Sequence, residues 1–351
     1  MEGMRPQPDI AGPTTVLDDA PHTQHKAPLW PGLLACLAAA LVALGIQQLV
    51  PGLSALLVAI LLGVAVAHAV ALPRSLQPGI AVSGKRLLRL GIVLLGFQLA
   101  LDDILALGWG TIAVVVAVVS AGLVGTVLVG RRLGLTHGQS VLIAAGFSIC
   151  GAAAVAAVEG SVEREDEDVA TAIALVVVFG TLMIGVVPAV LALTGLPLEV
   201  KGMIAGGSIH EVAQVVAAGG IIGGGALATA VLVKLARVLM LAPVVTVLGL
   251  LERRHAGEAV PAGAKRPPLV PLFVVGFLAA ALLRTVVPLP DLVLDAAHLL
   301  QVLLLSAAMF ALGLGVHVSM LKAAGARPFV LGAFATVLVS AVATTGFLLV
   351  A

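Results

Sequence analysis

The chain has 351 residues, of which 60% are apolar and 11% are charged, and its formal net charge is +1. Soluble domains carry about 25% charged residues, and the mean hydropathy here is +1.18, so the composition excludes an ordinary soluble domain. Two cysteines, Cys36 and Cys150, are too few for a disulfide framework or a cysteine-based zinc site. Continuous apolar runs of about 20 residues predict an all-α polytopic membrane protein, whereas a β-barrel would show short alternating segments.

The first segment, residues 1–28, lacks apolar periodicity and is predicted to be a disordered cytoplasmic tail. Residues 29–351 are predicted to form a single transmembrane transport domain. The one long loop, at 252–268, is predicted to be a cytoplasmic linker. The hydropathy pattern predicts about eleven spans, at 29–49, 53–72, 84–101, 104–129, 139–158, 169–194, 202–221, 226–250, 269–288, 293–315 and 328–350.

Lysine and arginine fall mostly on one set of loops, which the positive-inside rule assigns to the cytoplasm. The N-terminus is therefore predicted to be cytoplasmic and the C-terminus outside, in a bacterial inner membrane. In this topology Lys201 is cytoplasmic, and the acidic run at 163–168 lies outside together with Arg164. Three further cations fall within predicted spans: Lys234, Arg237 and Arg284.

Two internal repeats are visible in the sequence. Residues 95–108 match residues 312–325, and these two segments run in opposite directions, as an inverted repeat requires. Residues 146–151 match residues 206–211, and both segments place Gly and Ser at mid-membrane, where a helix can break and expose backbone groups to a substrate. The spans of the second match run in the same direction in this topology. They form an inverted repeat only if a span is re-entrant, which the sequence leaves open.

Lys234 and Arg237 are the most informative pair, because they lie near the middle of the apolar run 226–250. A charge there costs at least ~2.5 kcal/mol, and the i, i+3 spacing places both side chains on one helical face. Together they carry eight hydrogen-bond donors and no acceptor. An oxyanion or a carboxylate would satisfy them, so we predict that they bind substrate. The structural alternative is a buried ion pair with Glu211.

A polar cluster precedes this pair at 208–214. His210 and Glu211 are predicted to be coupling or gating groups, because His changes charge near pH 6–7 and a desolvated Glu can be neutral. The alternative is that His210 only caps a helix break. The pattern His-Glu-x-x-Gln resembles the zinc motif His-Glu-x-x-His, but Gln214 replaces the second ligand, so we predict no metal site.

The remaining predicted substrate-binding residues are small or polar. Ser148 and Ser208 follow glycines, where half-helix N-termini can present N–H groups to an anion, although small residues also serve simply as packing surface. Gly151 and Gln214 complete the predicted substrate-binding set. Gln98 is a weaker candidate.

Three segments carry a family resemblance: Gly-Phe-Ser-Ile-Cys-Gly-Ala-Ala-Ala at 146–154, Gly-Ser-Ile-His-Glu-Val-Ala-Gln-Val-Val-Ala-Ala-Gly at 207–219, and Lys-Leu-Ala-Arg-Val-Leu-Met-Leu-Ala-Pro at 234–243. With them the chain resembles the YeiH-type family of bacterial inner-membrane proteins, described as sulfate exporters. The resemblance covers residues 29–351. It implies a multi-pass inner-membrane protein that exports an anion.

The sequence therefore predicts a secondary transporter that exports a small oxyanion such as sulfate or sulfite. It is predicted not to be an enzyme, and its expected partners are the anion and the lipid bilayer, with no cofactor, metal or nucleic acid. Three alternatives stay open: a proton- or sodium-coupled carrier of an organic anion, a membrane enzyme that uses Ser148 or Cys150 with His210, and a non-transporting scaffold. The sequence does not decide whether the protein forms a homo-oligomer.

Overall fold

The computed structural model describes residues 28–50, 54–255, 271–315 and 325–351, although not the side chains of 166 and 252–255. Nearly all of the predicted tail and most of the predicted linker lie outside these residues. The last helix before the linker continues to His255, so the first four residues of the predicted linker are helical. Within the described ranges the secondary structure is helical, without strands.

The helices, in chain order, are α1 (Trp30–Leu49), α2 (Ala55–Ala69), α3 (Gln77–Val82), α4 (Leu88–Leu95), α5 (Leu101–Ala106), α6 (Gly108–Arg132), α7 (His137–Ser148), α8 (Ala152–Val158), α9 (Asp166–Ala192), α10 (Leu198–Ser208), α11 (Val212–Ile222), α12 (Ala226–Leu239), α13 (Leu241–His255), α14 (Leu272–Val286), α15 (Asp291–Leu314) and α17 (Ala326–Val350). Short helical turns η1 (Arg74–Leu76), η2 (Ser83–Leu87) and η3 (Gly96–Gln98) flank α3 and α4. Six helices of the described chain are long and apolar enough to cross a membrane. The predicted all-α polytopic fold is confirmed.

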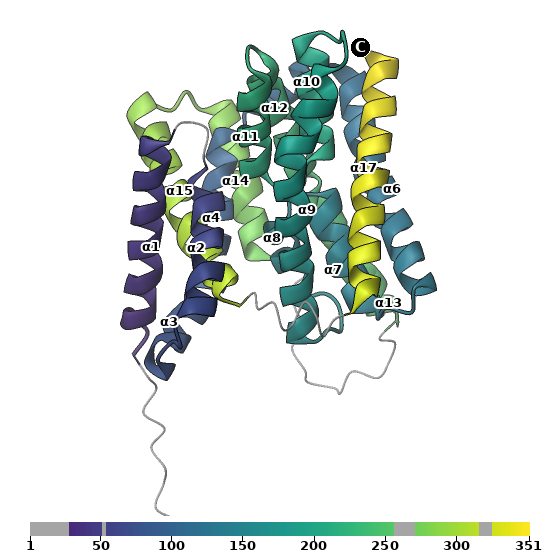
Figure 1. The fold of residues 1–351 in the computed structure, drawn as a ribbon. Helices are drawn as coiled ribbons and strands as arrows, with labels where there is room; N and C mark the ends of the chain where they lie inside the picture. The colour runs from purple at the N-terminus through teal and green to yellow at the C-terminus, as the bar shows by residue number, and fades with distance from the viewer. Residues whose placement is uncertain (1–27, 51–53, 256–270, 316–324) are drawn as a thin grey trace, which may run out of the picture.

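The predicted fifth span is a hairpin that returns to the face from which it starts. Its two arms, α7 and α8, are separated by three non-helical residues, 149–151. A Cβ atom on Gly138, at the start of α7, would lie 2.1 Å from the main-chain oxygen of Glu163, which follows α8. Both ends of this first hairpin therefore lie together, in the lower half of the view in Figure 1.

The predicted seventh span is a second hairpin, with arms α10 and α11 around residues 209–211. Leu198, at the start of α10, packs on Gly224, which follows α11. This hairpin occupies the upper half of the view in Figure 1, so the two hairpins enter from opposite faces, and α9 crosses between them. The predicted spans 139–158 and 202–221 are thus wrong as crossings. Hydropathy detects twenty apolar residues but not whether the chain turns back midway.

The second sequence repeat coincides with these hairpins residue by residue. The first helical arm ends at Ser148 in one hairpin and at Ser208 in the other, and the second arm begins at Ala152 and Val212. Because the hairpins enter from opposite faces, this repeat is an inverted one with helix breaks. In the sequence-based topology the two matching segments run in the same direction, which an inverted repeat does not allow. Both segments are re-entrant in the structure, so this conflict disappears.

The first sequence repeat also agrees with an inverted arrangement. Its end, Gly108 and Gly325, marks the starts of α6 and α17, which both have 25 residues. These helices pack antiparallel, with Gly122 against Val339 and Gly130 against Leu331. Two long helices thus flank the hairpins in opposite directions (Figure 1).

The hairpins also move two predicted loops to the other face. The loop that contains Arg164 lies on the face where α1 begins, and Lys201, near the start of α10, lies on the opposite face (Figure 1). The start of α1 and the end of α17 are at opposite faces, in agreement with the predicted placement of the termini. Which face is cytoplasmic stays a prediction.

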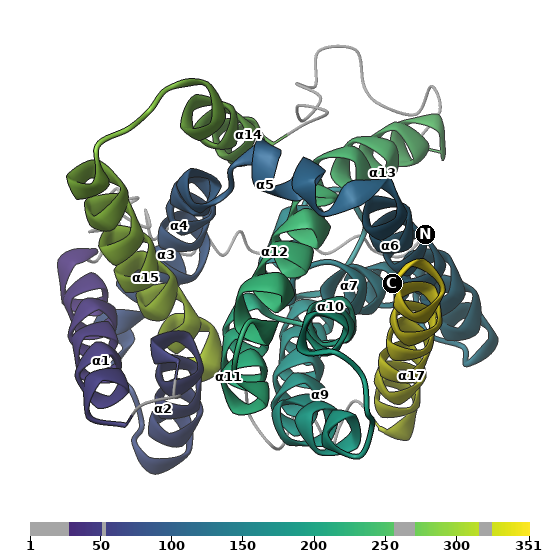
Figure 2. The same cartoon turned by 90° about the horizontal axis from the view of Figure 1, so that it is seen from above.

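Seen from above, the helices form two groups (Figure 2). The first half contains α1 to α4, α14 and α15, and the second half contains α6 to α13 and α17. Glycine allows close backbone packing within the first half: a Cβ on Gly63 of α2 would lie 3.0 Å from the Cα of Gly313 on α15. Such small-residue contacts replace the hydrophobic effect, which does not drive helix association in lipid.

The hairpin topology can be tested with single cysteines in a chain whose Cys36 and Cys150 are replaced by alanine. We expect Arg132→Cys and Glu167→Cys to react with a membrane-impermeant maleimide from one face, and Glu199→Cys from the other, because both ends of each hairpin share a face. Labelling of intact cells and inverted vesicles makes the measurement. Grouping of Arg132→Cys with Glu199→Cys would instead support eleven spans.

Candidate functional site

Lys234 lies on α12, opposite the two hairpin tips, which we define as residues 149–151 and 209–211. Its side chain is fully buried. The ammonium group donates to the main-chain oxygens of Ile149 at 2.7 Å, Ile209 at 3.0 Å and His210. Its three hydrogens thus have three carbonyl acceptors. One lysine therefore ties both tips to the same helix.

Arg237, one helical turn further along α12, is also fully buried and surrounded by carbonyl oxygens. Its Nη1 donates to Gly206, Gly207 and Ile209 at 2.7–3.1 Å. Its Nη2 and Nε donate to the main chain of 147–148 at 2.9–3.2 Å. All five N–H groups of the guanidinium are used.

These contacts explain why two cations lie at mid-membrane. The first arms α7 and α10 both end there, and the last carbonyls of a helix have no partner within it. The C-terminal end of a helix also carries about half a negative charge. Lys234 and Arg237 satisfy both requirements at once. Direct substrate binding by these two side chains stays a prediction, but in this arrangement their donors already have acceptors.

Glu211 connects the tips from the other side. Its carboxylate accepts from the main-chain N–H of Ala152 at 3.0 Å, at the start of α8. It also caps α11 in a reciprocal capping box with Gln214, whose Oε1 accepts from the Glu211 N–H at 3.0 Å. Within the described side chains no ion pair joins Glu211 to Lys234 or Arg237. The alternative of a buried ion pair is therefore not formed.

Gly151 makes this contact possible. Its φ is +82°, which strains any residue with a side chain. A Cβ atom there would lie 2.1 Å from Cγ of Glu211. Gly151 therefore serves the approach of one tip to the other, and it does not line the cavity described below.

The side chain of His210 points towards α17 and is not among the residues that line the central cavity described below. Its Nδ1 lies 3.2 Å from the Phe147 carbonyl oxygen and its Nε2 lies 3.0 Å from Oγ1 of Thr336. The imidazole also packs on the Phe147 ring, with centroids 4.5 Å apart. Among the described hydrogen bonds none joins His210 to Ser148 or Cys150, as a nucleophile–base pair would need.

The other predicted residues are buried beside the tips. Ser148 and Ser208 end α7 and α10, and their Oγ atoms find no hydrogen-bond partner in the described part of the chain. Gln214 packs against Gly180 of α9. None of the three lines the cavity. The structure thus gathers all eight predicted residues around the tips, and only Glu211 among them faces open space.

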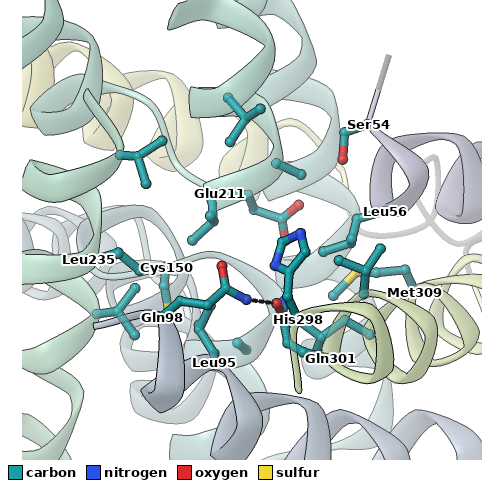
Figure 3. Close-up of a pocket in the computed structure, with 18 of the residues that line it drawn as sticks. Ser54, Leu56, Leu95, Gln98, Cys150, Glu211, Leu235, His298, Gln301 and Met309 are labelled. Atoms are coloured by element: carbon teal, nitrogen blue, oxygen red, sulfur yellow. Dashed lines mark hydrogen bonds between the residues drawn. The ribbon is translucent and has the colours of Figure 1, made fainter. Parts of the chain in front are cut away.

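A central cavity of about 520 Å³ lies between the two halves. Its walls are mostly aliphatic, with seven polar or ionisable side chains: Gln47, Ser54, Gln98, Cys150, Glu211, His298 and Gln301. The amide of Gln98 donates through Nε2 to Oε1 of Gln301, and these two residues form what we call the amide pair (Figure 3). Sequence reasoning named Gln98 only weakly and missed its partner, because 203 positions separate them. A glutamine inside an apolar run was the available signal.

The role of Arg237 can be tested through stability. We expect Arg237→Gln to destabilise the protein by several kcal/mol, because several buried carbonyls lose their donor and each unpaired group costs about 1–3 kcal/mol. Thermal unfolding in detergent and size-exclusion profiles measure this loss. Arg284→Gln, near the end of α14, is the control and should change little. An Arg237→Gln protein as stable as the wild type would contradict the structural role.

Comparison with known proteins identifies the family of this chain. A family model described as "Conserved hypothetical protein 698" matches residues 31–332. The chain is 54% identical over 319 residues to the UPF0324 membrane protein Cgl0015/cg0018 of Corynebacterium glutamicum, covering 91% of this chain and 92% of that protein. It is 41% identical to the UPF0324 membrane protein PA5383 of Pseudomonas aeruginosa over 87% and 90% of the two chains. It is 39% identical to the UPF0324 inner membrane protein YeiH of Escherichia coli over 80% and 81%. The chain belongs to this UPF0324 (YeiH) family of multi-pass inner-membrane proteins.

Proposed function

We propose that this protein is a secondary transporter that carries a small anion across the membrane without a chemical step. The observation that supports it best is the meeting of two oppositely inserted hairpins at Glu211, on the wall of the central cavity. Inverted repeats with helices broken near the midplane are how many secondary transporters build a substrate site. A scaffold without transport would not need polar backbone at mid-membrane.

A second cavity, of about 250 Å³, supports alternating access. It also lies at the boundary between the two halves, but nearer the face where α1 begins. Its lining includes Lys85, Glu159 and Gly315. Ala153 on α8 lines the central cavity, and Ala156, one turn away, lines the second. This turn of α8 therefore contributes to the walls of both spaces. In the proposed transport cycle, a shift of one half relative to the other connects them.

The first substrate class is an oxyanion such as sulfate or sulfite, exported from the cell. With the cell interior negative, each unit of negative charge that leaves gains ~2.3 kcal/mol per 100 mV. A dianion therefore needs no energy-coupling ion for export. The sequence contains no complete phosphate-binding motif Gly-x-x-x-x-Gly-Lys-Ser/Thr for nucleotide-driven pumping, because Arg86 follows Gly84-Lys85 where Ser or Thr is required.

A proton-coupled carrier of an organic anion is the second class, and one observation favours it. Glu211 is the only acidic side chain among the described residues that line the central cavity. Carboxylates inside a membrane domain often serve as proton sites in transporters. We therefore assign the predicted coupling role to Glu211 rather than to His210, which faces α17.

Flux through purified protein in liposomes tests the function. We expect anion flux in the wild type above that of empty liposomes. Glu211→Gln should keep exchange between equal pools but lose accumulation driven by a proton gradient, because the amide keeps the shape of the carboxyl group and cannot carry the proton. Glu167→Gln, an exposed acidic residue near the start of α9, is the control.

Three results would distinguish the exporter, the coupled carrier and a protein without transport activity. Sulfate or sulfite flux that ignores the proton gradient favours the exporter. Organic-anion flux that follows the gradient in the wild type only favours the coupled carrier. Absence of flux for both anion classes, in a protein shown to be folded by its unfolding transition, would refute the transporter proposal.

A further inference from the structure

The amide pair presents unused hydrogen-bond groups to the central cavity. One N–H of Gln98 donates to Oε1 of Gln301. Two N–H groups on Nε2 of Gln301 and one on Nε2 of Gln98 are therefore free to donate to an occupant of the cavity. Both side chains line the cavity, and neither amide has a further hydrogen bond among the described residues. His298, one turn before Gln301 on α15, lines the same space (Figure 3). The first half therefore presents three free N–H groups of the amide pair to the cavity, beside one free acceptor, Oε1 of Gln98.

The rest of the wall is aliphatic. Leu227, Val231 and Leu235 follow one face of α12, and Val302, Leu305 and Met309 follow α15. A cavity of about 520 Å³ falls in the size range of sites for small organic ligands, which are mostly apolar with a few placed polar groups. Sulfate alone would leave these apolar walls without a partner.

Charge indicates how many negative charges the occupant carries. The charged side chains around the tips are Lys234, Arg237 and one carboxylate, Glu211, and the two helix ends that the cations face carry about half a negative charge each. The tips therefore have little net charge. Since the free groups of the amide pair are neutral, burying a single negative charge against them costs less than burying a dianion, which favours a monovalent anion.

We propose that the central cavity binds a monovalent organic anion with a short hydrocarbon chain. Its carboxylate accepts from the amide pair and His298, and its chain lies against the aliphatic faces of α12 and α15. This proposal rests on the proposed transport function, and it narrows the substrate class of that same site. It favours the organic anion over sulfate.

Calorimetric titration of the purified protein with straight-chain carboxylates from acetate to hexanoate is the direct test. Because burial of one CH₂ group contributes about 0.8 kcal/mol, we expect affinity to rise about fourfold for each added carbon. The alcohol of equal chain length should bind much more weakly, since it lacks the charge. Affinity that does not change with chain length, or sulfate binding more tightly than butyrate, would overturn the proposal.

An isosteric variant tests the donors. Gln301→Glu keeps the oxygen that accepts from Gln98 and replaces the free NH₂ group by an oxygen that is negatively charged when ionised, so butyrate affinity should fall by at least about ten- to a hundredfold, the value of the lost hydrogen bond to a charged group, with the added repulsion on top. Ser306→Ala, buried on the same helix and outside the cavity, should bind as the wild type does. Gln98→Leu, which should also weaken binding, guards against a folding defect in Gln301→Glu. Wild-type affinity in both amide variants would refute the site.

The two proposals can fail separately. Sulfate flux in liposomes without carboxylate binding would refute this inference and leave the transporter standing. Carboxylate binding with the expected chain-length dependence, but without flux of any anion, would support the site and refute transport.

Discussion

The structure depends on one constraint: two helices end inside the membrane, and their last carbonyl groups need donors. Water cannot supply these donors in the hydrocarbon region, and each unpaired group there costs several kcal/mol. Lys234 and Arg237 provide eight N–H groups on one face of α12, and the carbonyls of 147–149, 206–207 and 209–210 accept them. The cost of burying two cations and the cost of breaking two helices therefore offset each other.

The second arms of the hairpins face the opposite requirement, since their first N–H groups need acceptors. Glu211 serves both α8 and α11 with a single carboxylate. The tips are thus held by cations on the side of α12 and by an anion between them, and all of these bonds are to main-chain groups. This explains how three charged side chains lie close together without a conventional ion pair within the described residues.

Much of this arrangement could be predicted from the sequence, and the part that failed has a clear cause. The apolar runs, the pair of repeats and the mid-membrane cations identified an all-helical polytopic fold with an inverted repeat and the residues of the tips. Hydropathy could not show that 139–158 and 202–221 turn back, because the turn is visible only in contacts between distant residues, such as those of Gly138 and Gly224, and leaves no mark on the apolar pattern. The acceptors of Lys234 could not be predicted either, because they are backbone carbonyls, which every residue has. Gln301 was missed because its partner comes from a distant helix.

The two halves contribute different groups to the central cavity. Because many hydrogen bonds join the tips to α12, we expect the tips to move as one body with it, whereas the amide pair and His298 belong to α15 and its neighbours in the other half. An occupant of the central cavity would therefore contact two bodies, with Glu211 on one side and amide donors on the other. Relative movement of these bodies changes the cavity without breaking the bonds that hold the helix ends. For the proposed transporter, a boundary between the halves rather than through the tips would let the protein change shape while its broken helices stay paired.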